Sequence, residues 1–126
     1  MSRIIRKPGV ISGGIVYLET AITSIFITAN THNLIIPDID TFSLVEMSST
    51  GNFNLTGIVP PDTVKAWELK IFNNGVNNII LKNNDLGSLS DNRFLNGGDI
   101  TCQSQEGFVL IYRPSVKKWS CPGKNI

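Results

Sequence analysis

The side chains that could carry chemistry are few and widely spaced along the chain. The only histidine, His32, lies in the turn-forming stretch of residues 29–33. A catalytic or metal-binding imidazole needs further ligands or a partner acid or thiol. His32 has no second histidine and no neighbouring cysteine, so we expect it to have neither a catalytic nor a metal-binding role.

The two cysteines, Cys102 and Cys121, lie in or next to predicted strands. Their spacing alone leaves a disulfide open. The basic first residues are not followed by an uninterrupted apolar stretch of signal-peptide type, so we expect a chain made in the cytoplasm, where thiols stay reduced. We therefore interpret both cysteines as small buried apolar residues. Residues 13–27 are apolar but contain Glu19 and are too short to span a bilayer, so no membrane partner is expected.

Two sets of acids and hydroxyls could in principle form sites. Asp38 and Asp40 could act as an acid pair on a glycan, although alternate acids on one strand are common by chance. The polar loop of residues 83–92 could offer oxygen ligands to calcium, but its spacing differs from that of an EF-hand loop. The donors in this loop are Asp85, Ser88, Ser90 and Asp91. We expect a solvent-exposed loop and no metal site.

No catalytic motif is present in the sequence. It has no Gly-x-Ser-x-Gly elbow and no paired histidines for zinc. Gly97-Gly98-Asp99 is a turn between strands rather than a phosphate loop, because no helix follows it. The sequence therefore predicts that the protein is not an enzyme and has no cofactor.

Charge excludes another class of function. The formal net charge is +1, and only 17% of residues are charged, below the roughly 25% of average domains. Binding many phosphates requires clustered Lys and Arg, so nucleic acid is not an expected partner. Lys117-Lys118 is interpreted as a solvated edge that discourages strand pairing.

The elements of the chain read as strands and turns. From Trp67 to Ile71 apolar and charged residues alternate, the pattern of a half-buried strand that places Trp67 inside. Residues 73–75, Asn-Asn-Gly, predict a tight hairpin turn with positive backbone angles, followed by a strand with Ile79 and Leu81 on one face. Residues 108–112 are the most apolar strand and are expected to be central, and a last short strand is expected over 116–119.

The first half of the chain has the same character. Residues 10–29, 34–36, 42–47 and 52–58 are predicted strands, rich in β-branched and aromatic residues. Residues 60–62, Pro-Pro-Asp, end the last of these. With no predicted helix and turns at regular intervals, the sequence indicates an all-β protein, an antiparallel jelly-roll-like β-sandwich.

Five short motifs occur in a fixed order: Thr56-Gly57-Ile58, Asn74-Gly75, Asn92-Arg93-Phe94, Tyr112 and Trp119. This order resembles the trimeric β-sandwich head domain of tailed-phage virion proteins, which include fibres, head decorations and small tail appendages. The resemblance covers roughly the last three quarters of the chain. In that family an acid often follows the tyrosine, where this chain has Arg113.

The resemblance implies a homotrimer whose structural motif includes Trp67, Asn92, Arg93, Phe94, Tyr112 and Trp119. Phe94 is then a core anchor, and Arg93 pairs with an acid or a carbonyl at a subunit contact. The partners it implies are other copies of the chain and the major capsid protein or another virion protein. The implied location is the virion, assembled in the host cytoplasm.

Residues 1–30 form the segment outside the best part of the resemblance. They are either a loose tail or an extended N-terminal arm, and residues 31–126 are the head domain. An arm that adds a strand to a neighbour would bury β-branched groups that a loose tail would expose. The residues expected to attach the arm are Arg3, Ile4, Ile5, Arg6, Val10 and Ile11.

The expected function is attachment and display, as a head fibre or capsid decoration. A small tail or collar component fits the same features. A carbohydrate-binding module that adheres to a host-surface glycan is a second alternative, and it would require Trp67 and Trp119 to be exposed. A cell-surface adhesion module is a third, although the chain shows neither tandem domains nor a signal.

Overall fold

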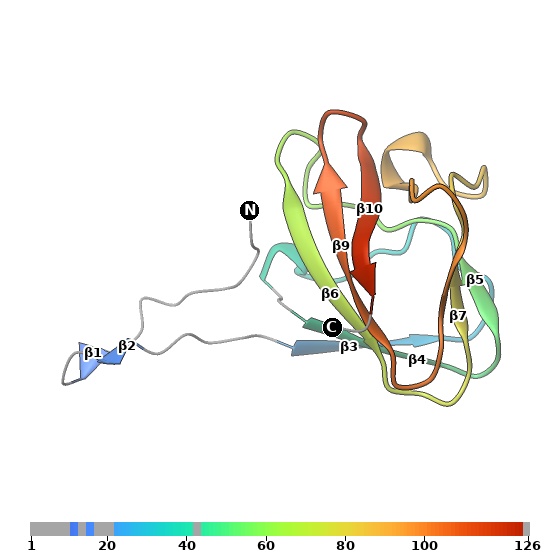
Figure 1. Cartoon of the computed structure of the whole chain (residues 1–126), viewed down its shortest axis with the longest axis horizontal. Coiled ribbons are helices and arrows are strands. Elements are labelled where there is room, and N and C mark those ends of the chain that lie inside the picture. The colour runs from blue at the N-terminus through green and yellow to red at the C-terminus, as the bar shows by residue number, and fades with distance from the viewer. Residues whose placement is uncertain (1–10, 13–14, 17–21, 42–43, 125–126) are drawn as a thin grey trace.

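The computed structural model describes residues 11–12, 15–16, 22–41 and 44–124, and within this part it contains strands and two short 3-10 turns but no α-helix. A five-stranded and a three-stranded sheet pack together into a sandwich (Figure 1). The all-β sandwich predicted from the sequence is therefore confirmed.

The larger sheet has the strand order β10-β9-β6-β4-β3. Its strands are β3 (Ile22–Ile27), β4 (Leu44–Ser49), β6 (Trp67–Asn73), β9 (Gly107–Arg113) and β10 (Lys118–Lys124). Strand β9 pairs antiparallel with β6 and β10, whereas β3, β4 and β6 run parallel. Lys118 begins β10, which is the last strand in this order.

The smaller sheet has the order β5-β7-β8. Its strands are β5 (Phe53–Leu55), β7 (Ile79–Leu81) and β8 (Ile100–Cys102), and the 3-10 turns are η1 (Ile39–Thr41) and η2 (Ser90–Asn92). Strands β1 (Ile11–Ser12) and β2 (Ile15–Val16) pair as a separate two-stranded sheet.

The prediction that the sheets are antiparallel was wrong, because both are mixed. The connections explain this. After β3 the chain passes the small sheet, where Thr31 bridges Leu55, and then returns as β4. After β4 it forms β5 and returns as β6. Each return begins at the same end of the large sheet, which makes the strands parallel, and such crossovers need long connections.

The predicted hairpin at residues 73–75 was also wrong. Strands β6 and β7 belong to different sheets, and no described residue from Asn73 to Gly75 has a positive φ. Asn73 is fully buried, and its Nδ2 donates to the carbonyls of Asn77 at 2.7 Å and Cys102 at 3.1 Å. The side-chain amide thus holds a connection between the sheets, instead of supplying a hairpin turn.

The core lies between the inner faces of the two sheets. Leu69 and Ile71 are buried while Lys70 between them is partly exposed, so the predicted alternation of β6 is confirmed. Strand β9 lies between β6 and β10, and Phe108, Leu110 and Tyr112 are fully buried, as predicted for a central strand. Trp67 is only partly buried at the end of the row.

Several predicted boundaries also moved. Residues 34–36 form no strand, only a bridge from Leu34 to Ile58, and the last strand extends to Lys124 with an irregularity after Ser120. Strand β3, assigned to the arm, pairs with β4 over six residues and is part of the large sheet. The arm residues Arg3, Ile4, Ile5, Arg6 and Val10 lie outside the described residues, and Ile11 begins β1.

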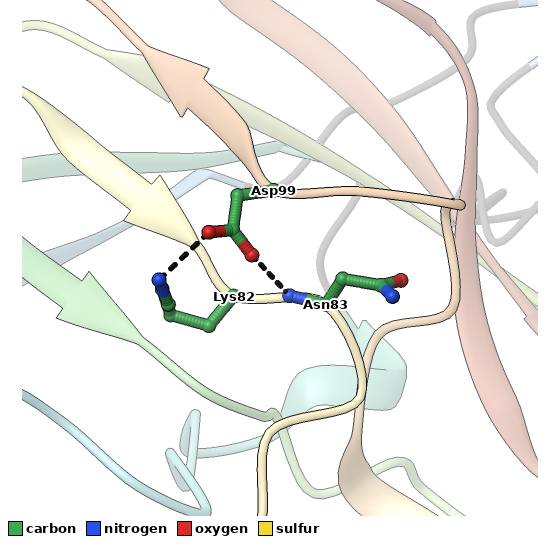
Figure 2. A network of polar contacts seen from close by, with 3 residues as sticks. All are labelled: Lys82, Asn83 and Asp99. Atoms are coloured by element: carbon green, nitrogen blue, oxygen red, sulfur yellow. Dashed lines mark hydrogen bonds and ion pairs between the residues drawn. The ribbon is translucent and has the colours of Figure 1, made fainter.

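An ion pair closes the connection between β7 and β8 (Figure 2). Lys82 Nζ lies 2.7 Å from Asp99 Oδ2, and the backbone N–H of Asn83 donates to Asp99 Oδ1 at 2.8 Å. The hydrogen bond from Lys82 lowers the pKa of Asp99, and the same bond raises the pKa of Lys82. The turn just before Asp99 contains Gly97, whose φ of 77° lies in the left-handed region.

Cys102 is buried and Cys121 is partly buried, and no disulfide joins them. The description of Cys102 as a buried small residue is confirmed, whereas Cys121 keeps some exposure. Within the described part of the chain, the structure has no helix long and apolar enough to cross a membrane.

Candidate functional site

Four of the five motifs meet at one end of the sandwich, and we call this group of residues the Trp119 cluster. Its members are Gly57, Ile58, Asn92, Arg93, Phe94, Tyr112 and Trp119. They come from the segment after β5, from the end of η2 and the segment after it, from the end of β9 and from the start of β10. Residues far apart in the sequence therefore form one buried arrangement.

Backbone hydrogen bonds join the segment around Phe94 to β10. The N–H of Trp119 donates to the carbonyl of Arg93 at 2.9 Å, and the N–H of Leu95 donates to the carbonyl of Trp119 at 2.7 Å. The side chains of Phe94 and Trp119 are both fully buried. The predicted core role of Phe94 is thus seen directly in its burial.

The indole of Trp119 connects this segment to the one after β5. Its Nε1 donates to the carbonyl of Ile58 at 2.8 Å, and the N–H of Ile58 donates to the carbonyl of Asn92 at 2.9 Å. A buried indole N–H needs such a partner, because leaving it unpaired would cost about 1–3 kcal/mol. The hydrogen bond fixes the register between three separate segments.

Tyr112 packs against Trp119 and closes the cluster. The two ring centroids are 5.1 Å apart at an interplanar angle of 73°, an edge-to-face contact. The hydroxyl of Tyr112 donates to the carbonyl of Asp91 at 2.8 Å. Burial, assisted by the negative charges of Asp91 and Asp62, raises the pKa of Tyr112 to about 12.

Gly57 allows the closest approach in the cluster. A Cβ atom at this position would lie 2.6 Å from the carbonyl oxygen of Asn92 and 2.6 Å from Ser88 Oγ. The glycine of the Thr-Gly-Ile motif is therefore required by packing, since no side chain fits between these two segments.

A polar network that no sequence pattern predicted lies next to Gly57. It consists of His32, Asn33, Thr56, Ser88 and Asn92. The hydroxyls of Thr56 and Ser88 are 2.7 Å apart, and His32 Nδ1 is 2.7 Å from Thr56 Oγ1. The Oδ1 of Asn33 accepts from Asn92 Nδ2 at 2.9 Å. The network fastens the loop of residues 83–92 to the segment before β4.

The network contradicts the expectation of a loop exposed to solvent throughout, because Ser88 is 2% exposed and Asn92 is 7% exposed. Ser88 Oγ also accepts from the N–H of Asn33 at 2.8 Å. His32 is an exposed side chain that bonds a hydroxyl, an arrangement that serves structure. No local sequence pattern could reveal this network, because Asn33 and Ser88 come from distant parts of the chain and meet only in the folded structure.

Arg93 bonds a carbonyl within its own chain. Its Nε donates to the carbonyl of Ser88 at 2.9 Å. This agrees with the expected pairing to a carbonyl. The further expectation, that the contact lies between subunits, stays a prediction.

The remaining motif lies elsewhere, whereas Trp67 of β6 is paired in register with Tyr112 of the cluster. Asn74 and Gly75 are at the far end of β6 from the cluster, where the N–H of Asn74 donates to the carbonyl of Met47. Trp67 Nε1 lies 3.4 Å from Asp62 Oδ1. That carboxylate also accepts from the N–H of Val64, the main cause of a lowered pKa for Asp62. The Asp62 carboxylate thus stabilises the turn that follows Pro60 and Pro61.

Two hollows meet at Val59 and Pro60 beside the cluster. One, of about 490 Å³, is lined mainly by apolar atoms and continues along residues 89–92. The other, of about 350 Å³, includes Asp38 and Asp40, both exposed. Among the described residues no group of three or more His, Cys, Asp or Glu side chains could hold a metal ion. The backbone carbonyl of Asp38 accepts a hydrogen bond from the N–H of Thr41 at 2.8 Å, within the same turn.

Comparisons of the chain with family models, with curated proteins and with solved structures returned no match. The function is therefore inferred from the chain's own residues.

The environment of Tyr112 predicts an unusual titration. In a Tyr17→Phe variant, Tyr112 is the only tyrosine, and its phenolate absorbance should appear near pH 12 instead of 10.0. Because the folded pKa is the higher one, this group's contribution to stability is complete below about pH 10 and is lost as pH rises through 12. Titration of the folded variant near pH 10 would contradict the burial of the hydroxyl.

Proposed function

We propose that the chain is a virion structural protein: a small homotrimeric head fibre or capsid decoration that attaches to the particle through its N-terminal arm. The observation that supports this most is the Trp119 cluster. Four motifs chosen for their order in the sequence come together in one buried arrangement. Their convergence on one buried arrangement supports the resemblance on which the proposal rests.

The use of polar groups fits a role in attachment and display. The carboxylates of Asp62 and Asp99 accept backbone N–H groups in turns. Ser88 and Thr56 bond each other, and Tyr112 bonds a carbonyl. Catalysis needs titratable groups that converge on a site where substrate can bind. These groups instead hold loops in place, so we infer a protein without enzymatic activity.

The alternatives differ in how well the described residues fit them. A tail or collar component would use the same head and differs only in location. A carbohydrate-binding module would stack an exposed aromatic ring on a sugar, but Trp119 is fully buried. Trp67 is partly buried and packs against the core. The full burial of Trp119 and the partial burial of Trp67 favour the structural role over glycan binding.

Deletion of residues 1–9 tests the attachment. We expect the truncated protein to keep its thermal midpoint, because the described sheets begin after this segment, and to be missing from purified particles that contain the full-length chain. Mass spectrometry of the particles measures incorporation, and calorimetry measures the midpoint.

The competing view places residues 4–11 within the sandwich. A large drop in the midpoint on truncation would support that view and would reject the arm. Absence of the full-length chain from purified virions would overturn the proposed function itself.

A further inference from the structure

Strand β3 is an open edge of the large sheet. It is the last strand in the order β10-β9-β6-β4-β3, and no described strand lies on its other side (Figure 1). It pairs with β4 in six consecutive positions without a shift. A regular edge strand of this kind presents a row of unpaired backbone groups that can bind another chain.

Other edges of the sandwich are covered by the chain itself. The segment of Arg93 and Leu95 covers the edge of β10. Its backbone bonds both the N–H and the carbonyl of Trp119. The edge of β5 is covered by Thr31, whose N–H donates to the carbonyl of Asn54 at 2.8 Å. Strand β8 is only three residues long. Among the described strands, β3 is thus the long edge without such a cover.

The side chains of β3 also lack the usual protection. Edge strands commonly carry Lys, Pro or a bulge that prevents pairing, and β3 has none of these. On its outer face Ile22 is 57% exposed and Phe26 is 63% exposed. Leu44 of β4 lies beside Ile22 in register and is partly exposed. We call Ile22, Phe26 and Leu44 the β3 patch.

We propose that the β3 patch is the surface through which copies of this chain meet about their threefold axis. This inference rests on the proposed homotrimer and identifies its interface. Burying large exposed apolar side chains is the main source of free energy for such an assembly, and the patch places two on one uncovered edge.

The charges around the patch favour an identical copy as the occupant. Strand β3 has no charged residue. On the same face, the register and burial pattern of β4 and β6 place Glu46, Glu68 and Lys70, so both signs are present. Such a surface does not match a strongly basic or acidic partner. It is compatible with itself, because an acid of one copy can face the lysine of the next.

Mass measurement in native buffer on two variants tests the interface. Phe26→Asp and Ile22→Asp should each convert the trimer to monomers, because each buries an unpaired charge at the interface. Val76→Asp is the matched control, since Val76 is 86% exposed on the connection between the sheets. The control should remain a trimer. Circular dichroism should show all three variants folded, because these side chains are mostly exposed in the single chain.

The outcomes separate the interface from the trimer. A wild-type monomer at micromolar concentration would overturn the homotrimer and this inference with it. A wild-type trimer that persists in both Asp variants would overturn the interface alone.

Hydrogen exchange of the wild-type chain gives a second measurement that does not depend on variants. The β3 amides that do not bond β4 should be protected in the trimer, and they should exchange faster when the protein is diluted below the dissociation constant of the trimer. Protection that is lost on deleting residues 1–10, while the protein stays trimeric, would show that the chain's own first residues cover β3 and would overturn the proposal.

Discussion

Replacing Phe94 with alanine is expected to lower the free energy of unfolding by about 3–5 kcal/mol. Phe94 has no exposed surface, and its backbone carries the bridge to Trp119. Truncating the ring removes its transfer free energy and leaves a cavity that the neighbouring core side chains cannot fill, because the backbone bonds hold their segments in place. Denaturant unfolding at one fixed protein concentration measures the change, since an oligomer's stability depends on concentration.

Leu86→Ala is the matched control for this variant. Leu86 lies in the preceding loop and is 85% exposed, so its truncation should change the free energy of unfolding by no more than about 0.5 kcal/mol. If Phe94→Ala changes stability as little as the control does, Phe94 is not the core anchor that its burial indicates.

The local pattern of the sequence was sufficient for the strands of the core. Alternation along β6 and the apolar run of β9 predicted which side chains are buried, because residues on a strand point to opposite faces in turn. The burial of Leu69, Ile71 and Leu110 depends only on this local geometry and on the presence of an opposing sheet. Fold class follows from the same information.

The pairing of strands could not be predicted in the same way. Asn73, Asn74 and Gly75 have the composition of a hairpin turn, yet β6 and β7 lie in different sheets. The connection between the two sheets is held by the buried side-chain amide of Asn73, which donates to the carbonyl of Cys102 far along the chain. Local turn preference is worth little beside such a contact, so tertiary structure decided the connection.

The candidate site was predicted in part. The motifs indicated Phe94, Tyr112 and Trp119 individually, but their edge-to-face contact and shared hydrogen bonds follow from the three-dimensional arrangement. The network of Thr56 and Ser88 had no sequence signal, because hydroxyl side chains in loops are common and usually bond to water or to nearby backbone. Only the short distance between two separate loops makes them a buried pair.

Replacing Gly57 with alanine is expected to lower the free energy of unfolding by about 1–3 kcal/mol, although the change adds only a methyl group. The new Cβ would lie 2.6 Å from the carbonyl oxygen of Asn92 and from Ser88 Oγ, and 2.7 Å from Ser88 Cβ. The Asn92 carbonyl cannot retreat without breaking its bond from the N–H of Ile58. Ser88 cannot turn away without losing Thr56. The strain therefore reaches both the Trp119 cluster and the polar network.

Gly98→Ala provides the matched control, since a Cβ atom at Gly98 meets nothing within 4 Å and its φ is not in the left-handed region. This variant should be neutral or slightly stabilising, because alanine reduces the entropy of the unfolded chain. Thermal and denaturant unfolding of the two variants, measured side by side, compare the sites. Equal midpoints would mean that the segments around Gly57 can separate at no cost, and the Trp119 cluster would then not be the rigid point at which four motifs meet.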